Sequence, residues 1–365
     1  MPTIAISGYY GLGNLGDEAI LAGIVAGFRR ASPGVRLTAL SADPQATQSL
    51  HDIEAVHRFN PAAVWATLRQ SDLLLSGGGG LLQDTTSLRS PLYYLGILRM
   101  ASWLGIPSMV FAQGIGPLRR GVVRRTARRV LNRVALATVR DAGSADALRA
   151  LGVSRPAIHI TADASLLMDP PSPQDARRAW QREKAEPPLR PRIGICLRPW
   201  GAATSHPWSA NLRRALEDLC RSRGASAVLV AMQRPGDLVF SLAMAHGFAA
   251  RAVSVVTPST PQEALALIAE MDVVLAMRLH AVVFACMMGV PCVGLAYDPK
   301  VRAFLEAVGQ PCLALDAEPR AVAEAVGSAL DERPERSAGL ATAMDPLRQA
   351  ALRNIELALA LLARR

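Results

Sequence analysis

The chain of 365 residues lacks most features that mark membrane-spanning, disulfide-rich or nucleic-acid-reading proteins. No apolar run is long enough to span a bilayer. The five cysteines are odd in number and show no C-x-x-C spacing, which favours reduced core thiols over a disulfide framework. The six histidines include no H-x-x-x-H pair, so we predict no bound metal. Aromatic residues make up only 5%, and no nucleic-acid recognition motif is present, so we expect no nucleic-acid partner.

Lysine is nearly absent as well. Of the 40 basic residues, only Lys184 and Lys300 are lysines, and the rest are arginines. The net charge of +10 therefore reflects arginine usage and says little about partners by itself. The densest basic run, residues 118–135, places arginines at helical spacing opposite valine and leucine. Such a helix can lie on anionic lipid, although a solvated face in an arginine-rich chain is the simpler explanation. The N-terminus enters a strand directly, which predicts a cytoplasmic protein, with contact to the cytoplasmic membrane face left open.

Short β-branched runs alternate with helix-period segments along the whole chain, as in parallel βαβ units. The stretch 169–191 is dense in proline and charge, and predicts a linker. It separates an N-terminal Rossmann-like domain, 1–168, from a C-terminal one, 192–345, and residues 346–365 form an amphipathic helix. The predicted fold class is therefore α/β, with two doubly wound domains that face a cleft. We predict strands near 3–7, 36–41, 72–76, 107–112, 135–139, 157–161, 193–197, 226–231, 252–256, 272–276 and 291–296.

The opening loop, SGYYGLGNLGDEAIL at residues 7–21, contains the G-x-G-x-x-G spacing of dinucleotide-binding turns. A ribose-binding acid should stand at the tip of the second strand, but Asp43 lies two residues beyond that tip. Asp17 and Glu18 directly follow the last glycine and would repel a diphosphate. The loop therefore stays open between a nucleotide site, a plain structural turn and a site for another ligand.

Further glycine-rich or polar clusters follow predicted strands, at the edge where open α/β sheets bind ligands. LLLSGGGGLLQD, residues 73–84, offers backbone N–H groups at Gly78 and Gly79 and indicates a ligand loop rather than a tight turn. Arg278 and His280 lie where a buried strand meets an apolar helix. That pair suits an anionic substrate that requires proton transfer, and a core histidine beside a structural arginine is the alternative.

Three more strand ends carry side chains of interest. Lys300 stands alone in an arginine-rich chain, which indicates a point charge rather than an exposed loop lysine. Arg140 is a candidate to clamp a carboxylate or phosphate with two hydrogen bonds, and the alternative is that this strand end only caps the following helix, through Asp141 or Ser144. Arg198 and Trp200 lie in a loop with a second tryptophan, which fits either a sugar-stacking platform or a core cover.

Six motifs in this order resemble the polysaccharide pyruvyl transferase family: GYYGLGNLGDEAI, GGGGLLQD, QGIGP, VRDAGS, MRLHA and YDPKV. They extend from Gly8 to Val301, and the likeness is strongest to the bacterial branch that modifies cell wall polysaccharide for S-layer anchoring. The resemblance implies a GT-B-like fold and a transferase that moves the enolpyruvyl unit of phosphoenolpyruvate onto a sugar diol as a cyclic ketal. Phosphoenolpyruvate is then a co-substrate, and no further cofactor is expected.

The resemblance also implies roles for individual residues. His280 and Arg278 match catalytic positions. Our own mechanistic hypothesis is that His280, protonated, is the general acid, and the choice between an acid and a base role stays open. The residues assigned to phosphoenolpyruvate are Arg140, Lys300, Arg278, Gly78, Gly79, Tyr10 and Gly13. The residues assigned to the acceptor are Asp17, Glu18, Leu12, Gln83, Arg198 and Trp200. Leu12 departs from the family, where an aromatic side chain is expected, and the implied acceptor is an N-acetylmannosamine residue on a lipid-linked oligosaccharide.

Two other functions fit the same features. A GT-B-type glycosyltransferase or epimerase acting on nucleotide sugars would use the same glycine loops. A catalytically silent polysaccharide-binding protein would keep the fold without the chemistry, but the Arg278, His280 and Lys300 set argues against it. The oligomeric state stays open.

Overall fold

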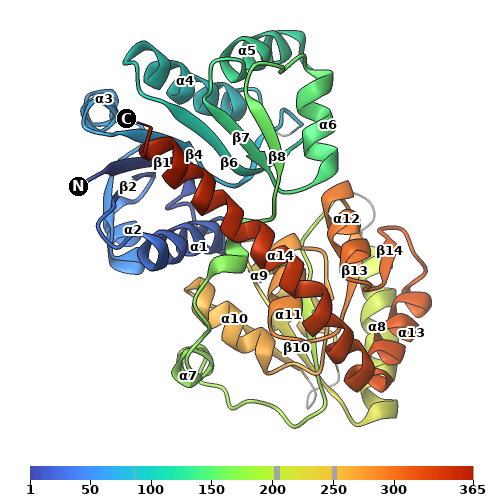
Figure 1. Cartoon of the computed structure of the whole chain (residues 1–365). Helices are drawn as coiled ribbons and strands as arrows, with labels where there is room; N and C mark the ends of the chain where they lie inside the picture. Colours follow the sequence, from blue (N-terminus) through green and yellow to red (C-terminus); the bar gives the residue numbers. More distant parts are fainter. Residues whose placement is uncertain (86, 201–205, 249–252, 365) are drawn as a thin grey trace. The chain divides into compact units, whose positions relative to one another are not determined.

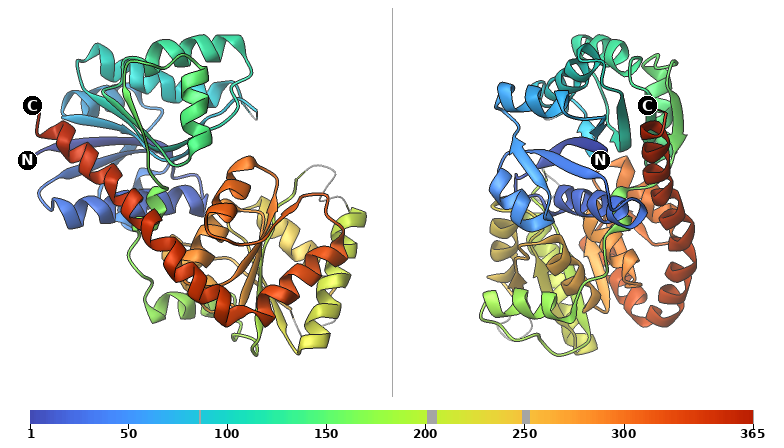
Figure 2. Two further views of the ribbon diagram at one scale, coloured as in Figure 1. Left: turned by 45° about the vertical axis from the view of Figure 1, so that its right-hand side comes forward. Right: turned by 60° about the vertical axis from the view of Figure 1, so that its left-hand side comes forward.

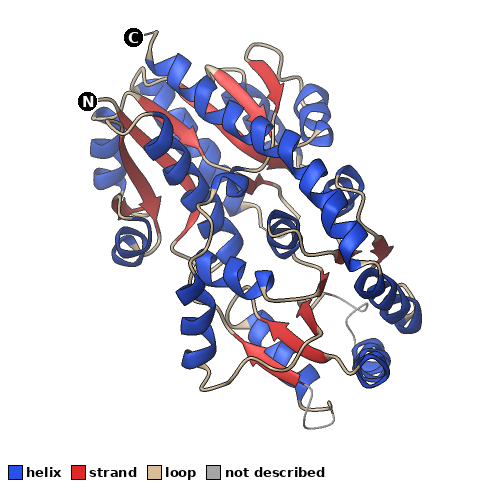
Figure 3. Cartoon of the chain, turned by 60° about the horizontal axis from the view of Figure 1, so that its bottom comes forward, coloured by secondary structure: helices blue, strands red, loops and turns tan. Residues whose placement is uncertain are grey.

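The computed structural model describes residues 1–85, 87–200, 206–248 and 253–364, and the chain divides into two compact units. Unit 1 comprises residues 1–169 and 346–365, and unit 2 comprises residues 170–345. In both units helices lie on either side of the strands (Figure 3). All strand pairs between described residues are parallel.

The sheet of unit 1 follows the order β3-β2-β1-β4-β6-β7-β8, and the short β5 pairs with β6 (Figure 1). The chain runs outward from β1 through β2 to β3, and then returns past β1 to β4. The order therefore reverses between β1 and β4, which makes this the switch point of a doubly wound sheet. The strands are β1 (Thr3–Tyr10), β2 (Arg36–Ser41), β3 (Glu54–His57), β4 (Leu73–Ser76), β5 (Gly79–Leu82), β6 (Ser108–Ile115), β7 (Leu136–Val139) and β8 (Ala157–Ile160).

The connections between parallel strands distribute the helices of unit 1 over both faces of this sheet. Figure 1 shows α1 and α2 on one side of the strands and α4 and α5 on the other. The last turns of α14 (Arg333–Leu362) return to the α1 side (Figure 2). There, a Cβ at Gly27 would lie 2.8 Å from Ile355 Cδ1. The helices are α1 (Leu15–Ala31), α2 (Pro44–His51), α3 (Pro61–Arg69), α4 (Arg89–Trp103), α5 (Gly121–Leu131), α6 (Ala142–Ala150) and the 3₁₀ helix η1 (Ala164–Leu167).

The sheet of unit 2 has the order β11-β10-β9-β12-β13-β14, which is the 3-2-1-4-5-6 order of dinucleotide-binding sheets. Its switch point lies between β9 and β12. The strands are β9 (Arg192–Cys196), β10 (Ser226–Val230), β11 (Val253–Val256), β12 (Val273–Ala276), β13 (Cys292–Ala296) and β14 (Cys312–Ala314). The helices are α7 (Pro173–Arg182), α8 (His206–Arg223), α9 (Gly236–Ala245), α10 (Pro261–Ala269), α11 (Leu279–Met287), α12 (Pro299–Ala307), α13 (Pro319–Asp331) and α14 (Arg333–Leu362).

Each of the predicted strands coincides with a strand of the structure, although residue 252 lies outside the described residues. Three strands escaped the sequence analysis: β3, β5 and β14. The tetraglycine stretch, predicted as a loop, is partly strand because β5 begins at Gly79.

The stretch predicted as a linker, 169–191, contains helix α7 and belongs to unit 2. Ser172 and Asp175 form a capping box at its start, and Trp180 is buried on its inner side. The predicted C-terminal helix also begins earlier than residue 346, because α14 runs without interruption from Arg333.

Candidate active site

Several residues predicted from sequence lie at the switch point of each sheet, while Arg140 follows β7 and Lys300 follows β13. In unit 1, Tyr10 ends β1 while Gly78 and Gly79 follow β4, the neighbouring strand. In unit 2, Arg198 follows β9 and Arg278 follows β12, which pairs with β9. Loops diverge there because successive crossovers leave on opposite faces, so the backbone opens to a ligand.

The opening loop is held by a hydrogen bond to the buried carboxylate of Glu18. Glu18 Oε1 accepts a hydrogen bond from the Gly11 N–H at 2.8 Å, and Glu18 Oε2 lies 3.0 Å from His51 Nε2. Both side chains are buried. Glu18 therefore holds the loop in place, in contrast to the acceptor-binding role that we predicted.

The tip of the opening loop remains accessible. Leu12 is 39% exposed, and Gly13 adopts a left-handed φ of 70° with no atom near the position of a Cβ. Asp17 is half-buried in the first turn of α1, where a Cβ at Gly79 would lie 2.9 Å from its Oδ1. The two glycine loops of unit 1 therefore meet at Asp17.

Tyr10 lies beneath these loops with its side chain buried. Its ring requires glycine on both sides, since a Cβ would come within 2.2 Å of Tyr10 Cζ at Gly8 and within 2.3 Å of the hydroxyl at Gly77. Burial raises the pKa of Tyr10 well above its ordinary value, and the carboxylates of Asp17 and Glu18 add to the effect. The hydroxyl is therefore a neutral donor, and it makes no hydrogen bond within the described part of the chain.

The second glycine loop is supported from β6. Gln113 Nε2 donates to Ser76 Oγ at 2.8 Å and to the carbonyl oxygens of Ser76 and Gly77, both at 3.0 Å. Gly79 takes a left-handed φ of 87°, a conformation that side chains disfavour. Gln83 is half-buried and accepts a short hydrogen bond from the Thr85 hydroxyl, so its amide is already engaged within the loop.

Arg140 directly follows β7 and lies flat against the backbone of β6. A Cβ at Gly114 would come within 2.6 Å of Arg140 Nη2, so only glycine leaves room for the guanidinium. Arg140 Nη1 donates to Asp163 Oδ2 at 2.7 Å, and the side chain of each partner is at most 6% exposed. As predicted, Asp141 caps the following helix, with Oδ1 2.6 Å from the Ser144 N–H.

Arg278 and His280 open helix α11 in unit 2. Arg278 is the N-cap residue, and His280 stands in the first turn, half-buried, with its ring centroid 6.5 Å from that of Phe284. Asp237 holds the guanidinium with two oxygens, at 2.9 Å from Nε and 2.6 Å from Nη2. Gln233 Oε1 accepts a further hydrogen bond from Nη2 at 2.9 Å. The guanidinium is thus fixed at the helix N-terminus that also carries the imidazole.

Lys300 and the Arg198–Trp200 pair follow β13 and β9, the two strands that flank β12 in unit 2. Lys300 lies in the first turn of α12, with Nζ 2.9 Å from Asp298 Oδ2. The guanidinium of Arg198 lies 5.2 Å from the Trp200 ring centroid and 5.5 Å from that of Tyr297. The Trp200 and Tyr297 rings are 4.8 Å apart, and Trp200 is 38% exposed. This cluster offers a stacking surface with a cation behind it.

Sequence reasoning missed the carboxylates that hold the cations. Asp163 and Asp237 lie 23 and 41 residues from their arginines, so no local pattern links the partners. It also missed Arg58, which follows β3, is only 6% exposed and pairs with no carboxylate of a described residue. Arg58 instead donates to the Gly8 carbonyl at 3.1 Å and to the Tyr94 hydroxyl at 3.2 Å, and lies 4.3 Å from the Tyr93 ring centroid.

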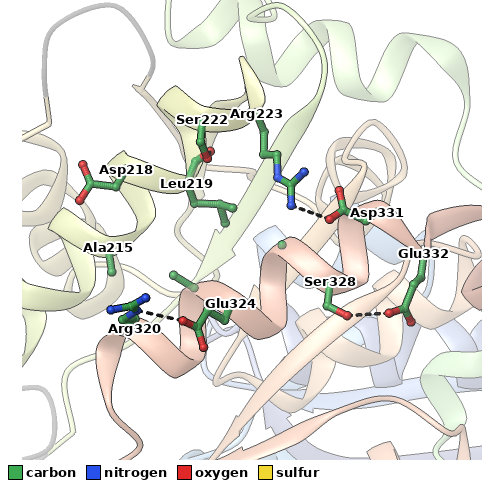
Figure 4. A pocket seen from close by; sticks show the side chains of 12 residues that line it. Ala215, Asp218, Leu219, Ser222, Arg223, Arg320, Glu324, Ser328, Asp331 and Glu332 are labelled. Carbon is green, nitrogen blue, oxygen red and sulfur yellow. Dashed lines mark hydrogen bonds and ion pairs between the residues drawn. The ribbon is translucent and has the colours of Figure 1, made fainter.

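A groove of about 960 Å³ lies away from these strand ends, between α8 and α13 (Figure 4). Two ion pairs join side chains that line it: Arg223 with Asp331 at 2.6 Å and Arg320 with Glu324 at 2.9 Å. None of the predicted site residues lines it. The groove therefore adds nothing to the candidate site. In the described part of the chain, no three His, Cys, Asp or Glu side chains are grouped to hold a metal ion.

The family model for polysaccharide pyruvyl transferases matches residues 14–299, which is more than half of the chain. The chain belongs to the polysaccharide pyruvyl transferase family. This assignment confirms the resemblance drawn from the six motifs, while the S-layer branch is not tested by it. A comparison with curated proteins gave no match.

Solved structures similar to this pyruvyl transferase family member share its GT-B-like fold at low sequence identity. Anabaena Alr3699/HepE, solved with UDP-glucose, is 15% identical with a TM-score of 0.64, and both chains are covered completely. A putative UDP-N-acetylglucosamine 2-epimerase from Listeria monocytogenes is 14% identical with a TM-score of 0.69, over 100% of this chain and 97% of the other. UDP-GlcNAc 2-epimerase from Neisseria meningitidis, bound to UDP-GlcNAc, is 13% identical with a TM-score of 0.66 and full coverage of both chains. The predicted fold class, α/β with two Rossmann-like domains, is thereby confirmed.

Proposed function

We propose that this family member transfers the enolpyruvyl group of phosphoenolpyruvate to two hydroxyls of a sugar and releases phosphate. The observation that carries the proposal is the start of α11, where Arg278 is fixed by Asp237 and His280 follows in the first turn. A permanent cation beside an imidazole at a helix N-terminus suits an anionic substrate that must be protonated. Membership of the pyruvyl transferase family supports the same chemistry.

The proposed reaction begins with protonation of the methylene carbon by His280. The C2 centre then has oxocarbenium character and is attacked by one sugar hydroxyl, which loses its proton. The C2–O bond to phosphate breaks, the second hydroxyl adds to the same carbon with loss of its proton, and the cyclic ketal closes. Of the two hydroxyl protons, one restores His280 and the other leaves with phosphate.

Phosphoenolpyruvate carries about three negative charges at neutral pH, since its phosphate contributes up to two and its carboxylate one. We assign Arg278 and Lys300 of unit 2 to these charges, together with Arg140. The Tyr10 hydroxyl and the backbone N–H groups of Gly13, Gly78 and Gly79 complete the proposed donor set. Among the predicted acceptor residues, the exposed Leu12 and Trp200 and the half-buried Asp17 and Arg198 stay in the proposal, while Glu18 does not.

The acceptor in this proposal is an N-acetylmannosamine residue of a lipid-linked cell wall precursor, as in the S-layer-anchoring branch. The test is phosphate release from phosphoenolpyruvate with soluble aryl and lipid-linked aminosugar acceptors. His280→Ala should lower kcat about 10²–10⁴-fold, the usual contribution of a positioned acid. His246→Ala, at an exposed histidine of unit 2, serves as the matched control and should leave kcat unchanged.

Near-native turnover of His280→Ala would remove this side chain from the acid role. The similar structures with UDP-glucose and UDP-GlcNAc favour one alternative, an enzyme acting on nucleotide sugars. Calorimetric titration with phosphoenolpyruvate and with UDP separates the two functions. Tighter binding of UDP, with no phosphate release from any acceptor mixture, would replace the pyruvyl transfer proposal.

A further inference from the structure

Helix α5 and its flanking residues carry a concentration of exposed arginines. The buried side of α5 is formed by Val123, Ala127, Val130 and Leu131, which pack into the core of unit 1. The opposite side is solvent-exposed. We name it the arginine face; its members are Arg119, Arg120, Arg124, Arg125, Arg128, Arg129 and Arg133.

The arginine face is distinguished by the number of exposed arginines that it gathers, seven within residues 119–133. Several exposed arginines elsewhere have carboxylate partners, such as Arg149 with Asp146 at 2.9 Å and Arg353 with Glu356 at 2.8 Å. No member of the arginine face forms an ion pair with a carboxylate of any described residue. Arg124 Nη1 donates a hydrogen bond to the Leu118 carbonyl oxygen, at 3.2 Å.

The elements packed against α5 do not supply the missing negative charge. Helix α4, which packs on α5, contains two arginines and no acidic residue. Asp84 is buried, and its two oxygens accept the backbone N–H groups of Arg119 and Arg120, both at 2.8 Å. Asp146 of α6 is engaged with Arg149. Seven like charges therefore remain on one exposed face without neighbouring carboxylates to offset them. An anionic surface is the complement of such a face.

Two exposed apolar side chains favour a lipid surface over a nucleic acid. Val122 is 48% exposed next to the arginines of α5, and Trp103 is 63% exposed at the end of α4. The Arg99 guanidinium lies 4.7 Å from the Trp103 ring centroid. Arginine with tryptophan and a small aliphatic group is the composition of helices that lie in the interface of anionic membranes. None of the described helices has the length and apolar composition needed to cross a bilayer.

We infer that the arginine face docks the protein onto the surface of an anionic membrane. The helix lies parallel to the surface, with its guanidinium groups at the lipid phosphates and Val122 at the headgroup boundary. Only the biological purpose of this docking, bringing the enzyme to a lipid-linked acceptor, rests on the proposed function. Binding itself requires neither phosphoenolpyruvate nor the acceptor.

The test is co-sedimentation of the full chain with vesicles of phosphatidylglycerol and phosphatidylcholine that contain no lipid-linked sugar. Each arginine near an anionic surface contributes roughly fivefold to partitioning, so Arg124→Gln with Arg129→Gln should weaken binding roughly 25-fold. The matched control is Arg36→Gln with Arg69→Gln, which removes two exposed charges elsewhere in unit 1. The control should bind like the native chain. Raising the salt concentration should release the native chain, since exposed charges are screened beyond about 10 Å at roughly 0.1 M salt.

Several outcomes would overturn the inference. These are no binding to phosphatidylglycerol vesicles, equal binding to pure phosphatidylcholine, or equal losses in the control variant. Stronger retention by a random DNA duplex than by vesicles, abolished by the same two substitutions, would assign the face to nucleic acid instead. Thermal unfolding must show that both variants are folded.

The outcome is independent of the proposed function. Phosphate release with a soluble aryl acceptor should be unchanged in the Arg124→Gln, Arg129→Gln variant. If that assay fails for every variant while vesicle binding follows the arginine face, the docking inference stands and pyruvyl transfer falls.

Discussion

Removal of the Asp237 carboxylate should uncouple helix α11 from α9, because this side chain is the main anchor of Arg278. Asp237 is 1% exposed and Arg278 13% exposed as side chains, so water can replace only a small part of the lost interaction. Asp237→Ala leaves a largely buried guanidinium with only Gln233 as a partner among the described residues. We expect a loss of stability confined to unit 2.

The magnitude follows from the two charged hydrogen bonds, at 2.9 and 2.6 Å. Each bond to a charged group contributes about 1.5–3 kcal/mol, and loss of one partner of a buried pair costs about 3–5 kcal/mol. Because both side chains are mostly buried, solvent screening does not reduce this figure. Asp237→Leu combined with Arg278→Met should recover most of the loss, since paired apolar replacement removes the unbalanced charge.

The assay is hydrogen exchange followed by mass spectrometry on peptides from α9 and α11, since a two-unit chain need not unfold in one step. The control is Asp218→Ala on α8, where the ion pair with Arg221 is 71% exposed on both sides. This variant should lose less than about 1 kcal/mol. A loss of that small size in Asp237→Ala as well would refute the buried anchor.

Three further changes test the supports of unit 1. Gly114→Ala should push the Arg140 guanidinium from its place, 2.6 Å from the new Cβ, and raise KM for phosphoenolpyruvate roughly tenfold with little change in kcat. Gly77→Ala should cost about 1–3 kcal/mol in urea unfolding, because its Cβ would lie 2.3 Å from the Tyr10 hydroxyl, and Tyr10→Phe should relieve part of the cost. Burial alone would raise the pKa of Asp84, but backbone N–H donors hold it below its ordinary value. Its contribution is therefore present above about pH 3.9 and lost as pH falls further, and Asp84→Asn should flatten the urea stability profile in that acid range.

Much of the fold could be predicted because buried parallel strands usually consist of short runs of apolar, often β-branched residues, which are easy to recognise in the sequence. The strands that escaped lack this signal. β3 reads EAVH with a single buried residue, and β14 is three residues long. β5 begins with two glycines, which read as loop. Helix α7 was hidden because proline and charge density indicate a linker, although Pro173 after the Ser172 cap is also a favoured helix start.

For the candidate site, the sequence predicted which residues lie at strand ends, but not which residues contact one another. A residue at the carboxyl end of a parallel strand can be placed at the ligand edge from sequence, which is how Arg140 and Arg278 were found. The partner of each arginine comes from another strand end, so Asp163 and Asp237 needed coordinates. Glu18 illustrates the opposite error. From the sequence, a carboxylate at a helix start looks free to bind a substrate, and only the structure shows that it contacts His51 instead.

The paired carboxylates bear on how the proposed phosphoenolpyruvate site would bind a trianion, and the sign of one affinity change tests it. Arg140, Arg278 and Lys300 each carry a carboxylate partner, so these three pairs have no net charge. If net positive charge drove binding, Asp237→Asn would bind phosphoenolpyruvate more tightly, because a negative charge is removed without change of shape. If fixed orientation of the guanidinium drives binding, the same variant should bind more weakly, since Arg278 would lose one of its two charged hydrogen bonds and with it roughly tenfold in affinity. Orientation is the stronger expectation because preorganised donors need no rearrangement when charge develops. Calorimetric titration of Asp237→Asn decides between them, and tighter binding that weakens steeply with salt would establish that net charge prevails.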